Sequence, residues 1–171
     1  RQQHPHAVAN LVEFWTYTGL RTSEIAGLKW DSVDWDQRSV QIHRANVRGH
    51  EKDKTKTATV RDVHLNGRAW SALLRQKVHT HSAGEHVFLD PRKQSPWNEE
   101  RAFRRSFWTP ALKKLEMRYR RPYNLRHSYA TLLLMSGATP AWAAKQLGHG
   151  VDVFLSTYAK WIDDGHSTIE E

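Results

Sequence analysis

Residues 33–65 constrain the fold most, because their side-chain pattern differs from the helical pattern on either side. Polar and apolar residues alternate there in short runs, which is the period of a half-buried β-strand. The runs cover residues 33–35, 39–43 and 59–65. We therefore expect three antiparallel strands joined by turns. The polar, basic stretch at residues 48–56 is expected to be a hairpin loop.

Helical spacing of apolar residues dominates the rest of the chain. The expected helices cover residues 7–17, 23–28, 67–77, 99–118, 122–136, 140–147 and 153–162. Pro110 should bend or break the long basic helix, whereas Gly137 and Gly148 should end helices. Leu115, Leu132, Trp142 and Trp161 are expected to pack against other helices or the core.

Length and composition favour one globular domain that contains both helices and strands. The chain has 171 residues, 39% of them hydrophobic and 26% charged, which is enough to bury a proper core. We expect an α+β fold over residues 1–171, mostly helical with one small three-stranded antiparallel sheet. No apolar run is long enough to cross a bilayer.

Charge and cysteine content narrow the choice of partners. Lys and Arg number 26 against 18 Asp and Glu, giving a net charge of +8, which suits a polyanionic partner such as DNA. The absence of cysteine excludes disulfides and thiolate metal sites, and is compatible with a reducing cytoplasm. Because the chain begins at Arg1, we expect it to be a fragment of a longer protein.

Five dispersed side chains could carry chemistry, although each also has an ordinary structural interpretation. Arg21 precedes a short helix, where a guanidinium and free amides would bind an anion. Tyr123 and Arg126 are three residues apart on one helix and share a face. His149 follows the end of a helix, a position that favours a protonated imidazole. Tyr158 lies on an amphipathic helix, where a core role is the usual one.

The order of these residues resembles the tyrosine recombinases of the phage integrase family. Four motifs carry the resemblance: Thr18 to Trp30 with its Thr-Gly-Leu-Arg-x-x-Glu pattern, Lys56-Thr57 ahead of a strand, Tyr123 to Thr131, and Leu147-Gly148-His149 with Tyr158 nine positions on. The first position of the family's His-x-x-Arg-His pattern is here Tyr123. A tyrosine can donate a hydrogen bond but cannot become a cation, so a general-base role at this position is in doubt.

This resemblance implies a set of site residues and no metal or other cofactor. It implies Tyr158 as the nucleophile, with Arg21, Arg126 and His149 on the phosphate and Tyr123 beside them. Lys56 is implied as the general acid and is preferred to Lys54 because of its spacing to the following strand. Glu24 and His127 would support these side chains, although an ordinary helix-capping role for Glu24 is equally open. The side chains that could contact DNA are Arg44, Arg48, Lys52, Lys54, Arg101, Arg104 and Arg105.

The implied activity is site-specific DNA recombination through a 3′-phosphotyrosyl intermediate, without metal or ATP. The expected partners are double-stranded DNA and, during strand exchange, three further copies in a tetramer, whereas the isolated domain can be a monomer. An N-terminal core-binding domain is expected to be absent from this chain, so its DNA binding should be weak and strongly salt-dependent. Two rivals stay open: a type IB topoisomerase, and a DNA-binding module that has lost catalysis, with Tyr123 as a sign of decay.

Overall fold

Backbone pairing in the computed structural model confirms the small antiparallel sheet. The structure describes residues 5–47, 50–53, 60–97 and 99–159. The sheet has the order β1-β2-β5, formed by β1 (Val33–Asp34), β2 (Ser39–Ile42) and β5 (Arg61–His64). Val40 lies opposite Val33 on one side and Val63 on the other, and Val40 and Val63 are fully buried. The two-residue period therefore directs one face of the sheet into the core.

Two further strand pairs lie outside this sheet. β3 (Arg44–Val47) pairs with β4 (His50–Asp53), and β6 (Leu89–Asp90) pairs with β7 (Ser95–Pro96). The expectation of a loop at residues 48–56 is therefore wrong for residues 50–53. The segment is polar and carries no alternating apolar signal, so only backbone hydrogen bonding defines β4 as a strand.

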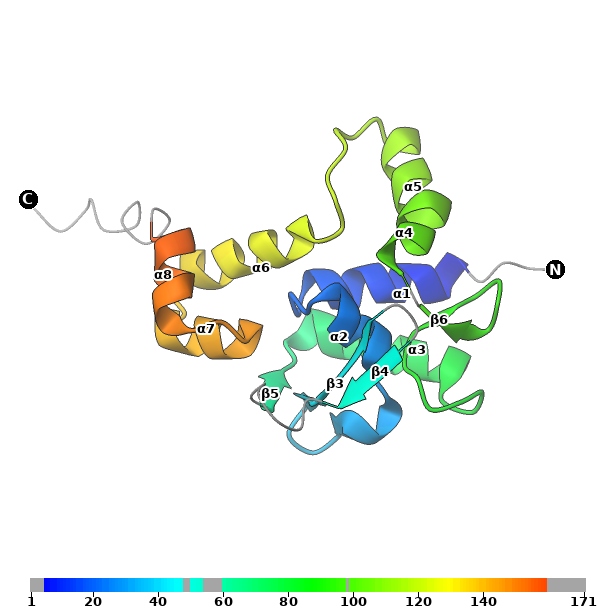
Figure 1. Cartoon of the computed structure of the whole chain (residues 1–171), viewed down its shortest axis with the longest axis horizontal. Helices are drawn as coiled ribbons and strands as arrows, with labels where there is room; N and C mark the ends of the chain where they lie inside the picture. Colours follow the sequence, from blue (N-terminus) through cyan, green and yellow to red (C-terminus); the bar gives the residue numbers. More distant parts are fainter. Residues whose placement is uncertain (1–4, 48–49, 54–59, 98, 160–171) are drawn as a thin grey trace, which may run out of the picture.

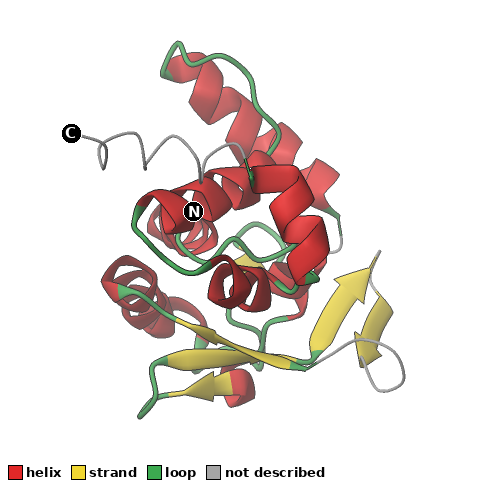
Figure 2. Cartoon of the chain, turned by 90° about the vertical axis from the view of Figure 1, so that its left-hand side faces the viewer, coloured by secondary structure: helices red, strands yellow, loops and turns green. Residues whose placement is uncertain are grey.

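Most of the chain's apolar side chains form one core between the sheet and the N-terminal helices. These helices are α1 (Pro5–Thr16), α2 (Thr22–Gly27) and α3 (Gly67–Thr80), with a short turn of 3₁₀ helix, η1 (Trp30–Ser32), before β1. The fully or nearly fully buried residues include Phe14, Leu20, Val40, Leu73 and Phe88. Figure 2 shows the helices gathered on one side of the strands, which leaves the other side of the sheet open.

The long basic helix is interrupted rather than broken at Pro110. It consists of α4 (Glu100–Phe103), a π-helical turn η2 (Arg104–Trp108) and α5 (Thr109–Lys114). Proline cannot donate its backbone hydrogen bond and collides with the preceding turn of a regular helix, and the wider π turn accommodates both effects. The helix ends four residues before the expected Arg118.

Three C-terminal helices make a second, smaller core. They are α6 (Asn124–Met135), α7 (Pro140–Leu147) and α8 (Val151–Tyr158), and they lie together at the left of Figure 1, away from α4 and α5. Their shared core contains Tyr129, Leu133, Leu147, Phe154 and Tyr158. The helix α7 has the expected bounds, whereas α6 begins two residues after the expected Pro122 and α8 begins two residues before the expected Val153. Gly137 and Gly148 follow α6 and α7 with positive φ, as expected.

Three residues that were expected to pack are instead exposed. Leu115, Leu132 and Trp142 are 66%, 47% and 40% exposed. Leu115 lies beyond the last turn of α5, and each C-terminal helix buries only the face that meets its two neighbours. Trp161 lies outside the described residues. In the part of the chain that the structure describes, we find no helix with the length and apolar character needed to span a membrane.

Candidate active site

Three arginines converge on the carboxyl end of α7. The last carbonyls of a helix lack intrahelical donors and carry partial negative charge, so they attract cations. Three successive carbonyls each accept a hydrogen bond from a different guanidinium: Gln146 from Arg61, Leu147 from Arg126 and Gly148 from Arg21. The distance is 3.0 Å for the Arg61 bond and 2.8 Å for the Arg21 bond. Side chains from three distant parts of the sequence thereby meet at one place.

A buried carboxylate, Glu24, holds two of these arginines. Arg61 donates to both Glu24 oxygens, at 3.0 and 2.9 Å, in the paired geometry that suits guanidinium and carboxylate. The Arg21 backbone N–H and guanidinium also donate to Glu24, at 2.9 and 3.1 Å. Burial opposes ionisation, but the hydrogen bonds and charges of Arg61 and Arg21 outweigh it and hold the pKa of Glu24 well below its usual value. Glu24 therefore orients both cations and also caps the first turn of α2.

Sequence reasoning missed Arg61 as a residue of this cluster. Arg61 begins β5 in the same phase as the buried Val63. A charged side chain in the buried phase of a strand needs a partner, because an unpaired buried charge is costly. The alternation of buried and exposed residues along β5 was therefore the feature of the sequence that could have identified Arg61. The partner, Glu24, lies 37 residues earlier and cannot be found from local pattern.

Arg126 is fully buried between two segments of backbone. Its Nη1 donates to the Gly19 carbonyl at 2.8 Å, and its Nη2 donates to the Leu147 carbonyl. Gly19 has a φ of +60°, and a Cβ there would lie 2.7 Å from Leu147 and 2.8 Å from Tyr129, so this close approach requires glycine. Burial, and then the charge of Arg21, lower the pKa of Arg126 to about 10. Arg126 is still a cation at pH 7, and its buried Nε has no partner among the described atoms.

His149 lies directly beyond these carbonyls, stacked on the nucleophile candidate. The rings of His149 and Tyr158 are 6.5 Å apart with planes inclined by 17°. Burial, followed by the charges of Arg126 and Arg21, lowers the pKa of His149 to about 4. Burial and the neighbouring guanidiniums therefore outweigh the effect of the helix end, which on its own favours a protonated imidazole. Its Nδ1 is buried and unpartnered among the described atoms.

Tyr158 completes the cluster from the last turn of α8. Its side chain is 1% exposed and packs on Phe154, with ring centroids 4.9 Å apart. The hydroxyl lies 2.7 Å from Nδ1 of His127. Burial raises the pKa of Tyr158, although the charge of Arg126 acts in the opposite direction. The charge of the buried Arg126 guanidinium therefore acts on the ionisation of the Tyr158 phenol.

The remaining expected catalytic residues differ in how the structure describes them. Tyr123 lies at the rim, 39% exposed, and its ring meets His127 edge-on at 5.4 Å. Lys56 and the alternative Lys54 lie outside the described residues. The structure thus brings Arg21, Arg126, His149 and Tyr158 together, with Tyr123 beside them.

The expected DNA contacts separate into three groups. Arg101, Arg104 and Arg105 line one groove along α4, η2 and α5, together with Lys113. Arg44 instead pairs with Asp31 at 2.6 Å, so a phosphate would have to compete with that carboxylate. Lys52 lies in β4, and Arg48 lies outside the described residues.

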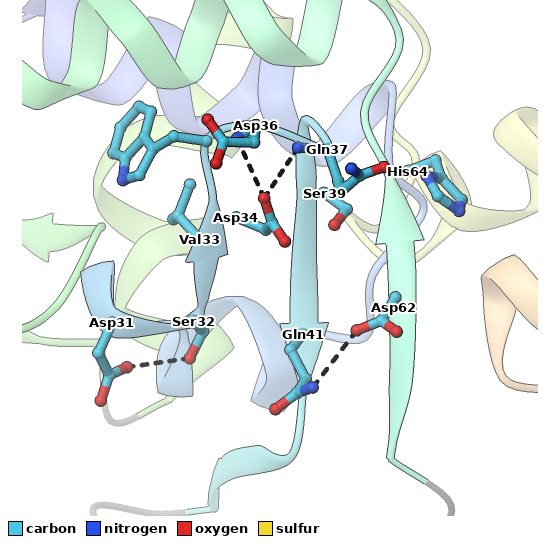
Figure 3. Close-up of a pocket in the computed structure, with 11 residues that line it drawn as sticks. Asp31, Ser32, Val33, Asp34, Asp36, Gln37, Ser39, Gln41, Asp62 and His64 are labelled. Atoms are coloured by element: carbon cyan, nitrogen blue, oxygen red, sulfur yellow. Dashed lines mark hydrogen bonds between the residues drawn. The ribbon is translucent and has the colours of Figure 1, made fainter.

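A groove on the open face of the sheet carries the opposite charge (Figure 3). Four aspartates line it: Asp31, Asp34, Asp36 and Asp62. Asp34 accepts hydrogen bonds from the backbone N–H groups of Asp36 and Gln37, at 3.0 and 2.8 Å, which closes the turn after β1. Negative charge on this face repels phosphates. A polyanion would therefore bind elsewhere, on a surface that presents the arginines.

Comparison with protein families agrees with the motif order and with this geometry. The model of the phage integrase family matches residues 2–163. The chain belongs to the phage integrase family.

Individual relatives are similar to this integrase-family chain over most of its length. It is 33% identical to the prophage integrase IntR of Escherichia coli (strain K12), covering 91% of this chain and 43% of IntR. Its fold matches the integrase of transposon Tn1549, solved with a circular intermediate DNA, with a TM-score of 0.73 and 21% identity over 87% of this chain and 53% of that one. The XerA recombinase gives a TM-score of 0.70 and 17% identity over 99% and 65% of the two chains. The chain thus spans about half the length of the integrases it matches.

Acid should destabilise this integrase-family domain in two stages. Burial lowers the pKa of His149 in the folded protein to about 4, against 6.5 for an ordinary histidine. The unfolded chain therefore binds the extra proton, and the free energy of unfolding falls as the pH drops from about 6.5 to 4. The Glu24 carboxyl has a depressed pKa, so its contribution is present above 4.5 and is lost below it. Urea unfolding at pH 7.5, 5.5 and 4.5 measures the first stage. His149→Asn should flatten that stage, and an unchanged pH dependence in the variant would contradict the assignment.

Proposed function

We propose that this chain cleaves and rejoins double-stranded DNA through a 3′-phosphotyrosyl bond at Tyr158, as a site-specific recombinase. The observation that carries the proposal is the position of the Tyr158 phenol, on one side of a cluster formed by Arg126, Arg21 and His149. The phenol oxygen attacks phosphorus, the bond to the 5′ oxygen breaks, and a 5′-hydroxyl from another strand reverses the step. Because the phosphotyrosine conserves the bond energy, no nucleotide hydrolysis is needed.

The arginines and His149 stabilise the charge that develops on the phosphate. The non-bridging oxygens gain negative charge as phosphorus becomes five-coordinate, and preorganised donors around them lower the barrier. Arg126 has five N–H groups and uses two on carbonyls, so donors remain for a phosphate oxygen. The unpartnered Arg126 Nε and His149 Nδ1 support this role. The two arginines supply the charge neutralisation that metal ions supply in other phosphoryl-transfer sites, and His149 adds a hydrogen bond.

Lys56 protonates the leaving 5′ oxygen in this proposal. Lys56 is five residues before Arg61, which is part of the cluster. Five residues span at most about 17 Å, so the chain length allows the lysine to reach the same phosphate. Protonation of the departing alkoxide is general acid catalysis.

We propose that the complete recombinase is longer than this chain. Because its relatives are about twice as long, we infer that a further DNA-binding domain contacts the duplex opposite this one. Strand exchange then involves four copies on two duplexes. The isolated chain should bind DNA weakly, since it supplies only part of the contact surface.

Covalent trapping tests the proposal directly. In a pool of duplexes of randomised sequence, each with a nick near the centre, cleavage just before the nick releases the short piece that carries the new 5′-hydroxyl. Without that hydroxyl the strand cannot be rejoined, and the protein stays attached to the 3′ end of the remaining DNA. The wild-type chain and the control Tyr119→Phe, at an exposed tyrosine, should both form an adduct that survives denaturation. Tyr158→Phe should form none, and mass spectrometry should locate the nucleotide on Tyr158.

The rival functions predict other outcomes. DNA binding without any adduct would show a module that has lost catalysis. Relaxation of supercoiled DNA without exchange between two labelled duplexes would show a topoisomerase. An adduct that persists in Tyr158→Phe would overturn the assignment of the nucleophile.

The groove lined by Arg101 and Arg105 should contribute to the salt dependence of DNA binding. Each phosphate contact adds about 0.9 to the slope of log affinity against log salt concentration. Replacing both arginines by glutamine should therefore reduce the slope by about 1.8. Fluorescence anisotropy across a salt series measures this slope, and Lys114→Gln on the same helix is the control. An unchanged slope in the double variant would remove this groove from the interface.

A further inference from the structure

The Tyr158 hydroxyl is in direct contact with a side chain that can accept its proton. Nδ1 of His127 lies 2.7 Å from the phenol oxygen. The tyrosine side chain is buried, whereas His127 is exposed on the outer side of α6. The imidazole therefore connects a buried phenol to solvent.

The other polar groups nearby are poor proton acceptors. Arg21 and Arg126 are cations at neutral pH and can only donate. Tyr123 occupies the position where the family pattern has histidine, and a neutral phenol is a weak base. The His149 ring lies nearly parallel to that of Tyr158, with centroids 6.5 Å apart, and burial lowers its pKa to about 4, so it is a weaker base than an ordinary imidazole. His127, by contrast, is a base within hydrogen-bond distance of the phenol oxygen, at 2.7 Å.

Cleavage requires that this proton leave. At pH 7 only about one free tyrosine in a thousand is a phenolate. Burial disfavours the phenolate of Tyr158 further. A base within hydrogen-bond distance removes this obstacle, because the proton transfers as the oxygen–phosphorus bond forms.

We propose that His127 is the general base of the cleavage step, and this inference rests on the proposed function. The neutral imidazole carries its proton on Nε2 and accepts the Tyr158 O–H at Nδ1. As the phenol oxygen bonds to phosphorus, the O–H bond breaks, an N–H bond forms on His127, and the 5′ oxygen leaves with a proton from Lys56. In the rejoining step His127 returns its proton to the departing phenol oxygen.

The surroundings of His127 suit this exchange. Tyr123 meets its ring edge-on at 5.4 Å with planes inclined by 80°, which restrains the imidazole plane. The groups that face it are Tyr123 on the same helix, Tyr158 on α8 and His149 beyond α7, with Arg126 next in sequence. The exposed edge of the ring is open to solvent, so the proton can be exchanged with buffer between steps.

The test separates a proton acceptor from a residue that only positions the phenol. In His127→Asn the amide oxygen can still accept the hydrogen bond but is not basic. The first-order rate of adduct formation at saturating protein should fall by about a hundredfold or more. Replacing Tyr158 by a more acidic fluorinated tyrosine should restore most of that rate in the variant. The control His6→Asn, at an exposed position of α1, should cleave like the wild type.

Each outcome bears on one claim. A His127→Asn rate within about twofold of the wild type would overturn the inference while leaving the proposed function intact. A large loss that the fluorinated tyrosine does not restore, with unchanged thermal unfolding, would show a positioning role and would also overturn it. A wild-type chain that forms no adduct would overturn the proposed function itself, and the inference with it.

Discussion

Replacing Glu24 by alanine is expected to lower the free energy of unfolding by about 3–5 kcal/mol. The substitution removes the carboxylate that holds Arg61 through two hydrogen bonds of 3.0 and 2.9 Å. Both side chains are almost fully buried, so the guanidinium would be left in the core without a counter-charge. Urea unfolding at pH 7.5, followed by circular dichroism, measures the loss.

Two further variants show that the loss comes from this pair. Removing both charges with Glu24→Leu and Arg61→Leu together should cost less than Glu24→Ala alone, because no buried charge is left unpaired. Glu85→Ala breaks an ion pair with Lys29 in which the glutamate is 77% exposed, so the effect should stay below about 1 kcal/mol. A Glu24→Ala variant as stable as Glu85→Ala would show that the buried pair is not needed for the fold.

Replacing Arg126 by lysine should slow DNA cleavage by about a hundred- to a thousandfold. The arginine bridges the carbonyls of Gly19 and Leu147 and still has donors to spare. A lysine keeps the charge, but its single nitrogen cannot reach both carbonyls and also hold a phosphate oxygen. The expected loss is therefore one of geometry rather than of charge.

Single-turnover cleavage at saturating protein separates this effect from DNA affinity. The matched control is Arg75→Lys, at a half-exposed arginine that pairs with Glu13 between α3 and α1. It should cleave within about twofold of the wild type, since surface ion pairs contribute little to stability. A cleavage rate for Arg126→Lys within about tenfold of the wild type would show that charge alone suffices at this position.

Sequence pattern predicted most of the fold because the relevant signals are local. Alternation located β1, β2 and β5, and glycines with positive φ ended α6 and α7. The strand β4 was missed because a polar two-stranded ribbon has no apolar alternation. The π-helical turn η2 was also missed. A proline in the sequence indicates that the helix is disturbed, but only the packing around Pro110 decides between a kink and a π turn.

The site was predictable as a set of residues but not as a set of contacts. Motif order pointed to Arg21, Arg126, His149 and Tyr158, and these side chains meet at the end of α7. Their catalytic roles stay predictions. The pKa of His149 could not be inferred, because burial and the neighbouring arginines oppose the local effect of the helix end.

The two hydrophobic cores of this domain meet at a polar boundary. Arg21 and Arg61 belong to the N-terminal part, and they hold α7 of the C-terminal part through its backbone. Arg21 and Arg126, which are proposed to bind a phosphate, are therefore also among the groups that join the two parts. Under the proposed function, phosphate binding at these arginines and cohesion of the domain should strengthen each other through linkage. In a chain whose C-terminal helices have detached, Arg21 and Arg126 no longer meet at the end of α7, so under the proposed function an incompletely folded copy should not cleave DNA.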